Sequence, residues 1–168
     1  FSTGAGRTGH MDANRDFEEL FRSLNAHRIK YLVVGAYAVM HYSVPRFTRD
    51  IDIWIPPELN DPRKTHRALT AFGAPMKDVR PEDLTDKNNI LQIGVEPIRI
   101  DILTSIEGLS PERAWRTRAQ GRYGKARIAI LGLSELIMTK RAAGRPQDKL
   151  DLAMLAKRPP ARRPGRKY

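Results

Sequence analysis

The sequence predicts an α/β domain, built from a small mixed β-sheet with helices on its flanks. Three observations support this fold class. Apolar segments with strand-like alternation recur along the chain, and segments with helical periodicity separate them. The stretch from Tyr31 to Met40 passes from an apolar strand through Gly35 directly into a short helix. The 168 residues show no internal repeat and no sign of a second domain.

The individual elements follow from periodicity and from helix start and stop signals. Asp12 or Asn14 caps a first helix, in which apolar residues recur with helical spacing at positions 17, 20, 21 and 24. Asp61-Pro62 opens another helix, because proline is well tolerated at the first helical position. The predicted strands lie at 29–34, 50–55, 90–94, 97–102 and 127–131. The predicted helices after the first lie at 35–41, 62–72, 110–119, 133–142 and 147–157, and 73–89 is a loop that can hold one helical turn.

Length and composition exclude several classes of protein. A domain of this length can bury roughly two-thirds of its unfolded surface. No apolar run approaches the roughly 20 residues that a membrane-spanning helix needs, and no secretory signal is visible, so we expect a cytoplasmic protein with no membrane partner. The absence of cysteine excludes disulfides, thiolate zinc sites and cysteine nucleophiles.

The two ends differ from the rest of the chain. Residues 1–10 contain Gly4-Ala-Gly6-Arg-Thr-Gly9, which has the glycine spacing of a dinucleotide-binding turn, but no strand precedes it. We interpret 1–10 as an expression leader and 11–156 as the domain. Residues 157–168 carry six cationic side chains and no acidic one, within a net charge of +11, so we expect a disordered tail. Such a tail is either a contact for RNA phosphates or a solubilising end with no partner.

Three acidic residues on two predicted strands indicate a metal site. Side chains alternate along a strand, so Asp50 and Asp52 share one face while the isoleucines between and after them share the other. Asp101 takes the same position in the strand at 97–102. Carboxylates held this close repel each other, and a divalent cation is the usual remedy because hard cations favour oxygen ligands. If the two strands are neighbours, all three acids can surround one or two metal ions.

The glycine turn adds a second chemical feature. Gly35 and Ala36 would present free N–H groups at a helix N-terminus, which is a suitable place for a phosphate. Carboxylates, metal and a phosphate cradle together suggest phosphoryl or nucleotidyl transfer. Taken alone, two acids on one strand are more often a solvated face.

At these residues the chain resembles the DNA polymerase β-type nucleotidyltransferase superfamily. Gly35-Ala36 is followed by thirteen residues and then by Asp50-Ile51-Asp52, in the order of the family signature. The bacterial branch of minimal proteins related to the AbiEii-type toxins is more similar still. Its motifs resemble three runs in this chain, which are Pro45-Arg-Phe-Thr-Arg-Asp-Ile-Asp52, Ile100-Asp-Ile-Leu-Thr104 and Lys140-Arg-Ala-Ala-Gly-Arg-Pro-Gln-Asp-Lys-Leu-Asp-Leu152.

The resemblance implies a nucleotidyltransferase fold and a role for each matching residue. Asp50 and Asp52 would bind Mg²⁺ bridging to the nucleoside triphosphate, and Asp101 would complete a second metal position and help activate the acceptor hydroxyl. Gly35 and the amide of Ala36 would approach the phosphates. The remaining implied nucleotide-binding residues are Arg46, Thr48, Arg49, Lys140, Arg145 and Asp148.

Simpler interpretations exist for several of these residues. Ala36 departs from the family pattern, which has serine or glycine there, and it offers no hydroxyl to a phosphate. Lys140 alone resembles a surface lysine of an amphipathic helix, and Arg145 and Asp148 can pair with each other. Trp54 either borders a base pocket or packs under a neighbouring helix.

One further basic feature lies outside the resemblance. Four arginines follow one another closely at positions 113, 116, 118 and 122. They form either a strip that meets RNA or the solvated face of a helix.

The sequence therefore leaves two alternative functions from different classes. The first is a Mg²⁺-dependent enzyme that moves an NMP from an NTP to a hydroxyl of RNA, protein or a small molecule. The second is a catalytically degenerate module of the same fold that binds nucleotide or RNA. The resemblance also implies a toxin with a cognate antitoxin as its partner.

Overall fold

A computed structural model describes residues 13–44, 49–95 and 97–157. The six strands are β1 (Leu32–Val34), β2 (Asp50–Trp54), β3 (Ile90–Ile93), β4 (Arg99–Leu103), β5 (Ala119–Tyr123) and β6 (Ala126–Ile130). The α-helices are α1 (Ala13–Ala26), α2 (Gly35–Tyr42), α3 (Pro62–Phe72), α4 (Pro111–Arg116), α5 (Leu133–Ala143) and α6 (Pro146–Ala156). Two short 3₁₀ helices are η1 (Pro57–Leu59) and η2 (Pro81–Thr85).

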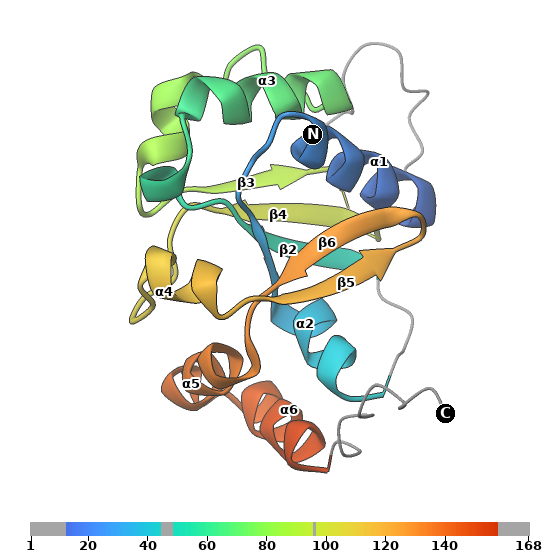
Figure 1. Ribbon diagram of the computed structural model, residues 1–168, viewed down its shortest axis with the longest axis vertical. Helices are drawn as coiled ribbons and strands as arrows, with labels where there is room; N and C mark the ends of the chain where they lie inside the picture. The colour runs from blue at the N-terminus through green and yellow to red at the C-terminus, as the bar shows by residue number, and fades with distance from the viewer. Residues whose placement is uncertain (1–12, 45–48, 96, 158–168) are drawn as a thin grey trace, which may run out of the picture.

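The strands form one mixed sheet in the order β3-β4-β2-β1-β6-β5. Neighbours pair in parallel at β2–β4 and β1–β6, and they pair antiparallel at β1–β2, β3–β4 and β5–β6. Figure 1 shows α1 and α3 on one side of this sheet and α2, α5 and α6 on the other. The expected small mixed sheet flanked by helices is therefore confirmed.

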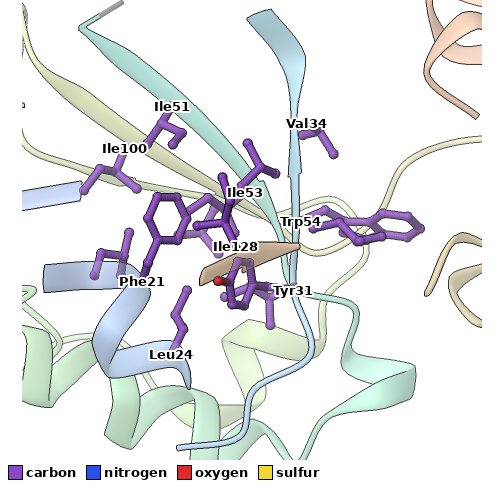
Figure 2. Packing of buried hydrophobic residues seen from close by; sticks show 14 of the residues in the cluster. Phe21, Leu24, Tyr31, Val34, Ile51, Ile53, Trp54, Ile100 and Ile128 are labelled. Carbon is purple, nitrogen blue, oxygen red and sulfur yellow. The ribbon is translucent and has the colours of Figure 1, made fainter. Parts of the chain in front are cut away.

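The alternation of side chains along the strands creates the core. Figure 2 shows Ile51, Ile53 and Ile100 gathered beside Phe21 and Leu24 of α1. All five are at most 1% exposed. Because successive strand residues point to opposite faces, this packing sends the polar residues of β2 and β4 to the other face of the sheet.

The start of α3 confirms the expected Asp-Pro signal. Asp61 accepts a hydrogen bond from the backbone N–H of Arg63 at 3.0 Å, and Pro62 is the first helical residue. Gly73 ends the helix with φ of 101°, a left-handed conformation that glycine adopts readily. Among the described residues, none of the helices is long and apolar enough to cross a membrane.

The predicted strand 29–34 is shorter than expected. Arg28 has φ of 55°, and the backbone N–H of Ile29 still donates to Leu24 O at 3.0 Å, which closes α1. Residues 29–31 therefore leave the helix before β1 begins at Leu32. Asn14 lies inside α1 rather than capping it, and Asp12 lies outside the described residues.

The predicted helix 110–119 was wrong at its C-terminal end. Helix α4 stops at Arg116, where the Thr117 hydroxyl and backbone N–H both contact Arg113 O at 3.0 Å. Residues 119–123 then form β5, a strand that the sequence did not predict. Arg118 and Arg122 thus do not lie on a helix, so the interpretation of the four arginines as one solvated helix face is wrong.

Candidate active site

The central feature is a cluster of charged residues on neighbouring strands. The β2–β4 register places Asp52 beside Asp101 and Asp50 beside Arg99. All four side chains occupy the face opposite the isoleucines, since the residues between them are the buried ones. The structure therefore brings together the acids that the sequence singled out, and it adds a cation, Arg99. The signal for Arg99 was its position two residues before Asp101, which gives it the same strand face.

Burial and like charge shape the protonation of this cluster. Burial, followed by the charges of Asp101 and Asp50, raises the pKa of Asp52 from 3.8 to about 6. A side-chain hydrogen bond with Asp101 acts in the same direction, and the charge of Arg99 opposes it. The carboxyl of Asp52 thus lies within hydrogen-bonding reach of the Asp101 side chain.

Arg99 forms an ion pair with Asp101. Its Nε lies 3.1 Å from Asp101 Oδ1, and the two side chains are 32% and 16% exposed. The pair is an ion pair without hydrogen-bond alignment, so Asp101 Oδ1 is buried without receiving a hydrogen bond. A buried carboxylate oxygen of this kind fits direct ligation of a cation.

The cluster fits Mg²⁺ as a partial site. Within residues 13–44, 49–95 and 97–157, no three acidic or histidine side chains are already grouped to hold a metal ion. Mg²⁺ is commonly bound by only one or two carboxylates, with water and substrate phosphates completing its octahedron. Asp52 and Asp101 can supply those two carboxylates.

Gly35 joins the cluster to the first turn of α2. The residue has φ of 64°, in the left-handed region that glycine tolerates. A Cβ at this position would overlap Asp52 Oδ2 and lie 3.1 Å from Asp52 Cγ. The backbone of the turn therefore lies directly against the Asp52 carboxyl group, with Ala36 as the next residue of α2.

A cavity of about 670 Å³ connects these features with the closing helices. Gly35 and Asp52 line it on one side, and Lys140, Arg145 and Asp148 line it on the other. Apolar side chains complete the wall at Val34, Leu103, Ile106, Leu131 and Leu136. Residues more than one hundred positions apart in the sequence thus share one cavity.

The charge of Lys140 is engaged by two aspartates. Its Nζ lies 3.2 Å from Asp148 Oδ1 and 2.9 Å from Asp151 Oδ2, and both aspartate side chains are at most 2% exposed. Asp148 also accepts a hydrogen bond from the Arg145 backbone N–H at 3.1 Å, which caps α6. Hydrogen bonds from Arg145 and then Lys140 hold the pKa of Asp148 down to about 2. Asp151 was missed as a candidate, although its i+3 spacing from Asp148 places both on one helix face.

Arg145 differs from Lys140 in its exposure. Its Nε donates to Asp148 Oδ2 at 2.7 Å, yet the side chain remains 73% exposed, whereas that of Lys140 is 11% exposed. The expected pairing of Arg145 with Asp148 is therefore present, and Arg145 is the more accessible cation of the cavity.

A family model matches residues 13–163, and it describes a nucleotidyl transferase of unknown function, DUF2204. The chain belongs to this family. The match covers most of the chain and includes both acidic strands, the glycine turn and the closing helices. Membership makes the protein a nucleotidyl transferase, as the signature residues led us to expect. Among proteins of curated function, none matches the chain.

Solved nucleotidyltransferase structures share the fold of this DUF2204 protein. The lincosamide antibiotic adenylyltransferase LnuA, solved with lincomycin bound, has a TM-score of 0.56 and 14% identity, over 85% of this chain and 96% of that chain. A Thermotoga maritima protein described as a nucleotidyltransferase has a TM-score of 0.55 and 17% identity, over 83% and 89% of the two chains. The antibiotic-resistance factor ANT(2'')-Ia has a TM-score of 0.56 and 10% identity, over 87% and 84%. Identities this low show a common fold and nothing more specific.

Four other residues of the DUF2204 chain were considered as part of the site from the sequence, and the structure describes two of them. Arg46 and Thr48 lie outside the described residues. Arg49 is exposed, and its backbone carbonyl accepts a hydrogen bond from the Arg99 N–H at 3.1 Å, so it stands next to the cluster. Trp54 shares the strand face of the acids, but it is 1% exposed and its indole N–H donates to Thr104 O at 3.3 Å. Figure 2 shows Trp54 on the side of β2 away from Ile53, and the tryptophan is a packing residue.

Proposed function

We propose that this protein is a Mg²⁺-dependent nucleotidyltransferase that moves an NMP from an NTP to an acceptor hydroxyl. The proposal depends on the Asp52–Asp101 pair. The two acids are direct neighbours on the parallel strands β2 and β4, and Asp52 lies against the Gly35 turn. The pKa of Asp52 is raised by burial and by the neighbouring acids, and Asp101 Oδ1 is buried without a hydrogen bond. Both observations favour a cation between these two acids.

The residues of the cavity have complementary roles in this proposal. Asp52 and Asp101 would hold Mg²⁺, with Asp50 on the same face of β2 beside them, and the metal would supply charge neutralisation for the triphosphate. The amides of Gly35 and Ala36 donate to phosphate oxygens at the start of α2. Arg145 reaches the outer phosphates, because its guanidinium is exposed at the cavity. Lys140 fixes the two closing helices through Asp148 and Asp151.

The transfer step balances as a substitution at the α-phosphorus. The acceptor oxygen forms a bond to the α-phosphorus, the bond from this phosphorus to the α–β bridging oxygen breaks, and pyrophosphate leaves. A carboxylate oxygen of Asp101 takes the proton of the acceptor hydroxyl. Positioning and charge neutralisation provide most of the catalysis in reactions of this type.

The proposal is tested by a transfer assay. The full-length protein is incubated with each α-³²P-labelled NTP, with Mg²⁺ or EDTA, and with RNA, protein or antibiotic acceptors. Label transfer should require Mg²⁺ and should fall by at least about 100-fold in Asp52→Asn and Asp101→Asn. Asp78→Asn, at an exposed acid outside the cavity, is the matched control and should retain full activity. Transfer that persists in Asp52→Asn would remove this site from the mechanism.

A degenerate nucleotide-binding module is the second candidate. Ala36 lacks a hydroxyl for the phosphates, and the described residues hold no three-ligand metal group in advance. This candidate predicts NTP binding without turnover, with an affinity that Asp101→Asn does not change. A toxin role of the AbiEii type would add growth inhibition that depends on Asp52 and is relieved by a cognate antitoxin.

A further inference from the structure

A second cavity, of about 570 Å³, lies beside the β5–β6 hairpin. Arg118, Arg122 and Arg127 line it together with Trp115 and Tyr31. Among the described residues that line this cavity, none is acidic. We name it the arginine groove. Its lining combines guanidinium groups, which recognise phosphates, with an aromatic ring.

The strand register places Arg122 and Arg127 on the same face of the sheet as the acids, whereas Tyr31 reaches the groove from the isoleucine side. Val33 pairs with both Ile53 and Ile130, so these three residues share the isoleucine face. Asp52 and Arg127 are offset from this row by odd numbers of residues, and both therefore point to the opposite face. Standard strand dimensions put their Cα atoms about 16 Å apart, two strands across and four residues along.

Arg122 and Arg127 form a repulsive pair in the groove. They are directly opposite each other in the β5–β6 register, and both are exposed. Like charges at directly opposed positions destabilise a strand pair. Neither arginine makes an ion pair with an acid in the described part of the chain. A bound anion would relieve this repulsion.

The backbone beneath Arg127 is held in place. Its carbonyl oxygen accepts hydrogen bonds from the Tyr31 hydroxyl at 3.1 Å and from Asn25 Nδ2 at 2.9 Å. The Tyr31 ring stacks on Phe21 of α1 at a centroid distance of 5.7 Å. The position of Arg127 is thus fixed by the core before any ligand binds, which lowers the entropy lost on binding.

Trp115 provides a stacking surface next to the arginines. The Arg118 guanidinium carbon lies 3.9 Å from the Trp115 ring centroid, and Arg118 Nη1 donates to Trp115 O at 2.6 Å. Lys30 Nζ lies 5.9 Å from the same ring. Two cations and a half-buried indole are therefore gathered at one point, and planar guanidinium groups also stack on bases.

We propose that the arginine groove binds a single-stranded nucleic acid. Backbone phosphates contact Arg122 and Arg127, and a base stacks on the Trp115–Arg118 platform, which is the combination that single-strand-binding surfaces use. The further inference that the bound strand is the acceptor rests on the proposed function, and Arg122, Arg127 and the acids share one face of the sheet. As a statement about binding, it is independent of transfer.

The first experiment measures binding alone, without NTP or Mg²⁺. Full-length protein is titrated into a fluorescein-labelled single-stranded RNA of mixed sequence, and anisotropy is recorded between 50 and 300 mM salt. For single strands the logarithmic salt slope is about −0.7 per neutralised phosphate. Arg122→Ala/Arg127→Ala should therefore make the slope shallower by about 1.4 and weaken binding about 25-fold at 0.1 M salt.

The matched control is Lys64→Ala/Arg67→Ala, which removes two exposed charges from α3 on the other side of the sheet. Its slope and affinity should equal those of the parent protein. All variants retain residues 157–168, so differences between them report the groove. Equal binding by the parent and the Arg122→Ala/Arg127→Ala variant would overturn the proposal.

A second readout uses tryptophan fluorescence. RNA that stacks in the groove should quench the emission of Trp115, and the quenching should disappear in Trp115→Leu, while buried Trp54 is unaffected. Parallel titrations with single-stranded DNA of the same sequence show whether the 2′-hydroxyl contributes. Equal quenching by duplex DNA, or by anionic lipid vesicles, would contradict a single-strand site. Asp52→Asn should bind RNA normally, so loss of transfer and loss of binding are separate results.

Discussion

Gly35 and Asp52 are in van der Waals contact across the start of α2, so that no side chain can be added to Gly35 without displacing the Asp52 carboxyl group. The strand β1 ends at Val34, which pairs with Asp52 in the antiparallel β1–β2 register. Gly35 is therefore the first residue beyond the sheet and lies beside the acid. This contact explains why the turn and the acids belong to one site.

Gly35→Ala should lower both stability and activity. An alanine in the left-handed region costs roughly 1–2 kcal/mol, and here its Cβ also overlaps Asp52. Gly144→Ala is the matched control, because Gly144 has φ of 61° and its nearest other atom would be 3.8 Å from the new Cβ. Urea unfolding should show a larger loss for Gly35→Ala than for Gly144→Ala. Equal losses would contradict the contact with Asp52.

Asp52 should make the metal-free protein less stable as the pH rises. Its pKa is about 6 in the folded state and 3.8 as the ordinary value. Well below pH 4 the Asp52 carboxyl is protonated in both the folded and the unfolded state, and well above pH 6 it is ionised in both. The folded state alone suffers from burial and repulsion of this charge, so its stability falls as the pH rises between these values. The free energy of unfolding is lowered by at most about 3 kcal/mol.

The measurement is urea unfolding in EDTA at several pH values. Asp52→Asn should be more stable than the parent protein at pH 8, and this advantage should disappear near pH 4. A parent protein whose stability does not fall between pH 4 and pH 7, relative to Asp52→Asn, would show that Asp52 titrates normally.

Arg99 should compete with Mg²⁺ for Asp101. Its Nε lies 3.1 Å from Asp101 Oδ1, and its charge lowers the pKa of Asp52. Arg99→Met should therefore tighten Mg²⁺ binding about tenfold, measured by calorimetry with a non-hydrolysable NTP, because removing a nearby positive charge favours a second cation. The same variant should lose stability in EDTA at pH 8. Arg67→Met, on α3, should change neither quantity, and an unchanged Mg²⁺ affinity in Arg99→Met would argue against competition.

Lys140 should be required for folding more than for phosphate binding. Lys140→Met would leave Asp148 and Asp151 without their shared cation while both remain buried. Removing one partner of a buried ion pair lowers the free energy of unfolding by about 3–5 kcal/mol. Lys149→Met, at an exposed position of α6, should change the free energy of unfolding by less than about 0.5 kcal/mol.

A compensating variant separates structure from catalysis. Adding Asp151→Asn to Lys140→Met removes the buried charge that has lost its cation, whereas Asp148 keeps its ion pair with Arg145, and should restore part of the lost stability. If this double variant is no more stable than Lys140→Met, the buried network is not what Lys140 supports.

The sequence was most informative where local pattern and tertiary structure agree. Phe17, Leu20, Phe21 and Leu24 were expected on one helix face, and all four are fully buried. The alternation in β2 and β4 correctly placed Asp52 and Asp101 on one face, because the isoleucines between them must enter the core. That the two strands are parallel neighbours required the structure, since register depends on distant pairing.

The sequence failed where an element depends on distant contacts. Strand β5 has the sequence Ala-Gln-Gly-Arg-Tyr, which contains little apolar alternation, and it exists because it pairs with β6 and packs Tyr123 against Phe17 and Phe21. Arg99 and Asp151 were missed for a related reason. Spacing placed Arg99 on the face of Asp101 and Asp151 on the face of Asp148, but the ion pairs that give them a role form only in the folded structure.

Anomalous diffraction from crystals grown with Mn²⁺ and a non-hydrolysable NTP would show whether the paired acids bind a metal ion. We expect a manganese peak in direct contact with the carboxylates of Asp52 and Asp101, with the triphosphate beside the Gly35 turn and Arg99 displaced from Asp101. A nucleotide bound elsewhere, or no peak between these carboxylates at saturating Mn²⁺, would contradict this expectation.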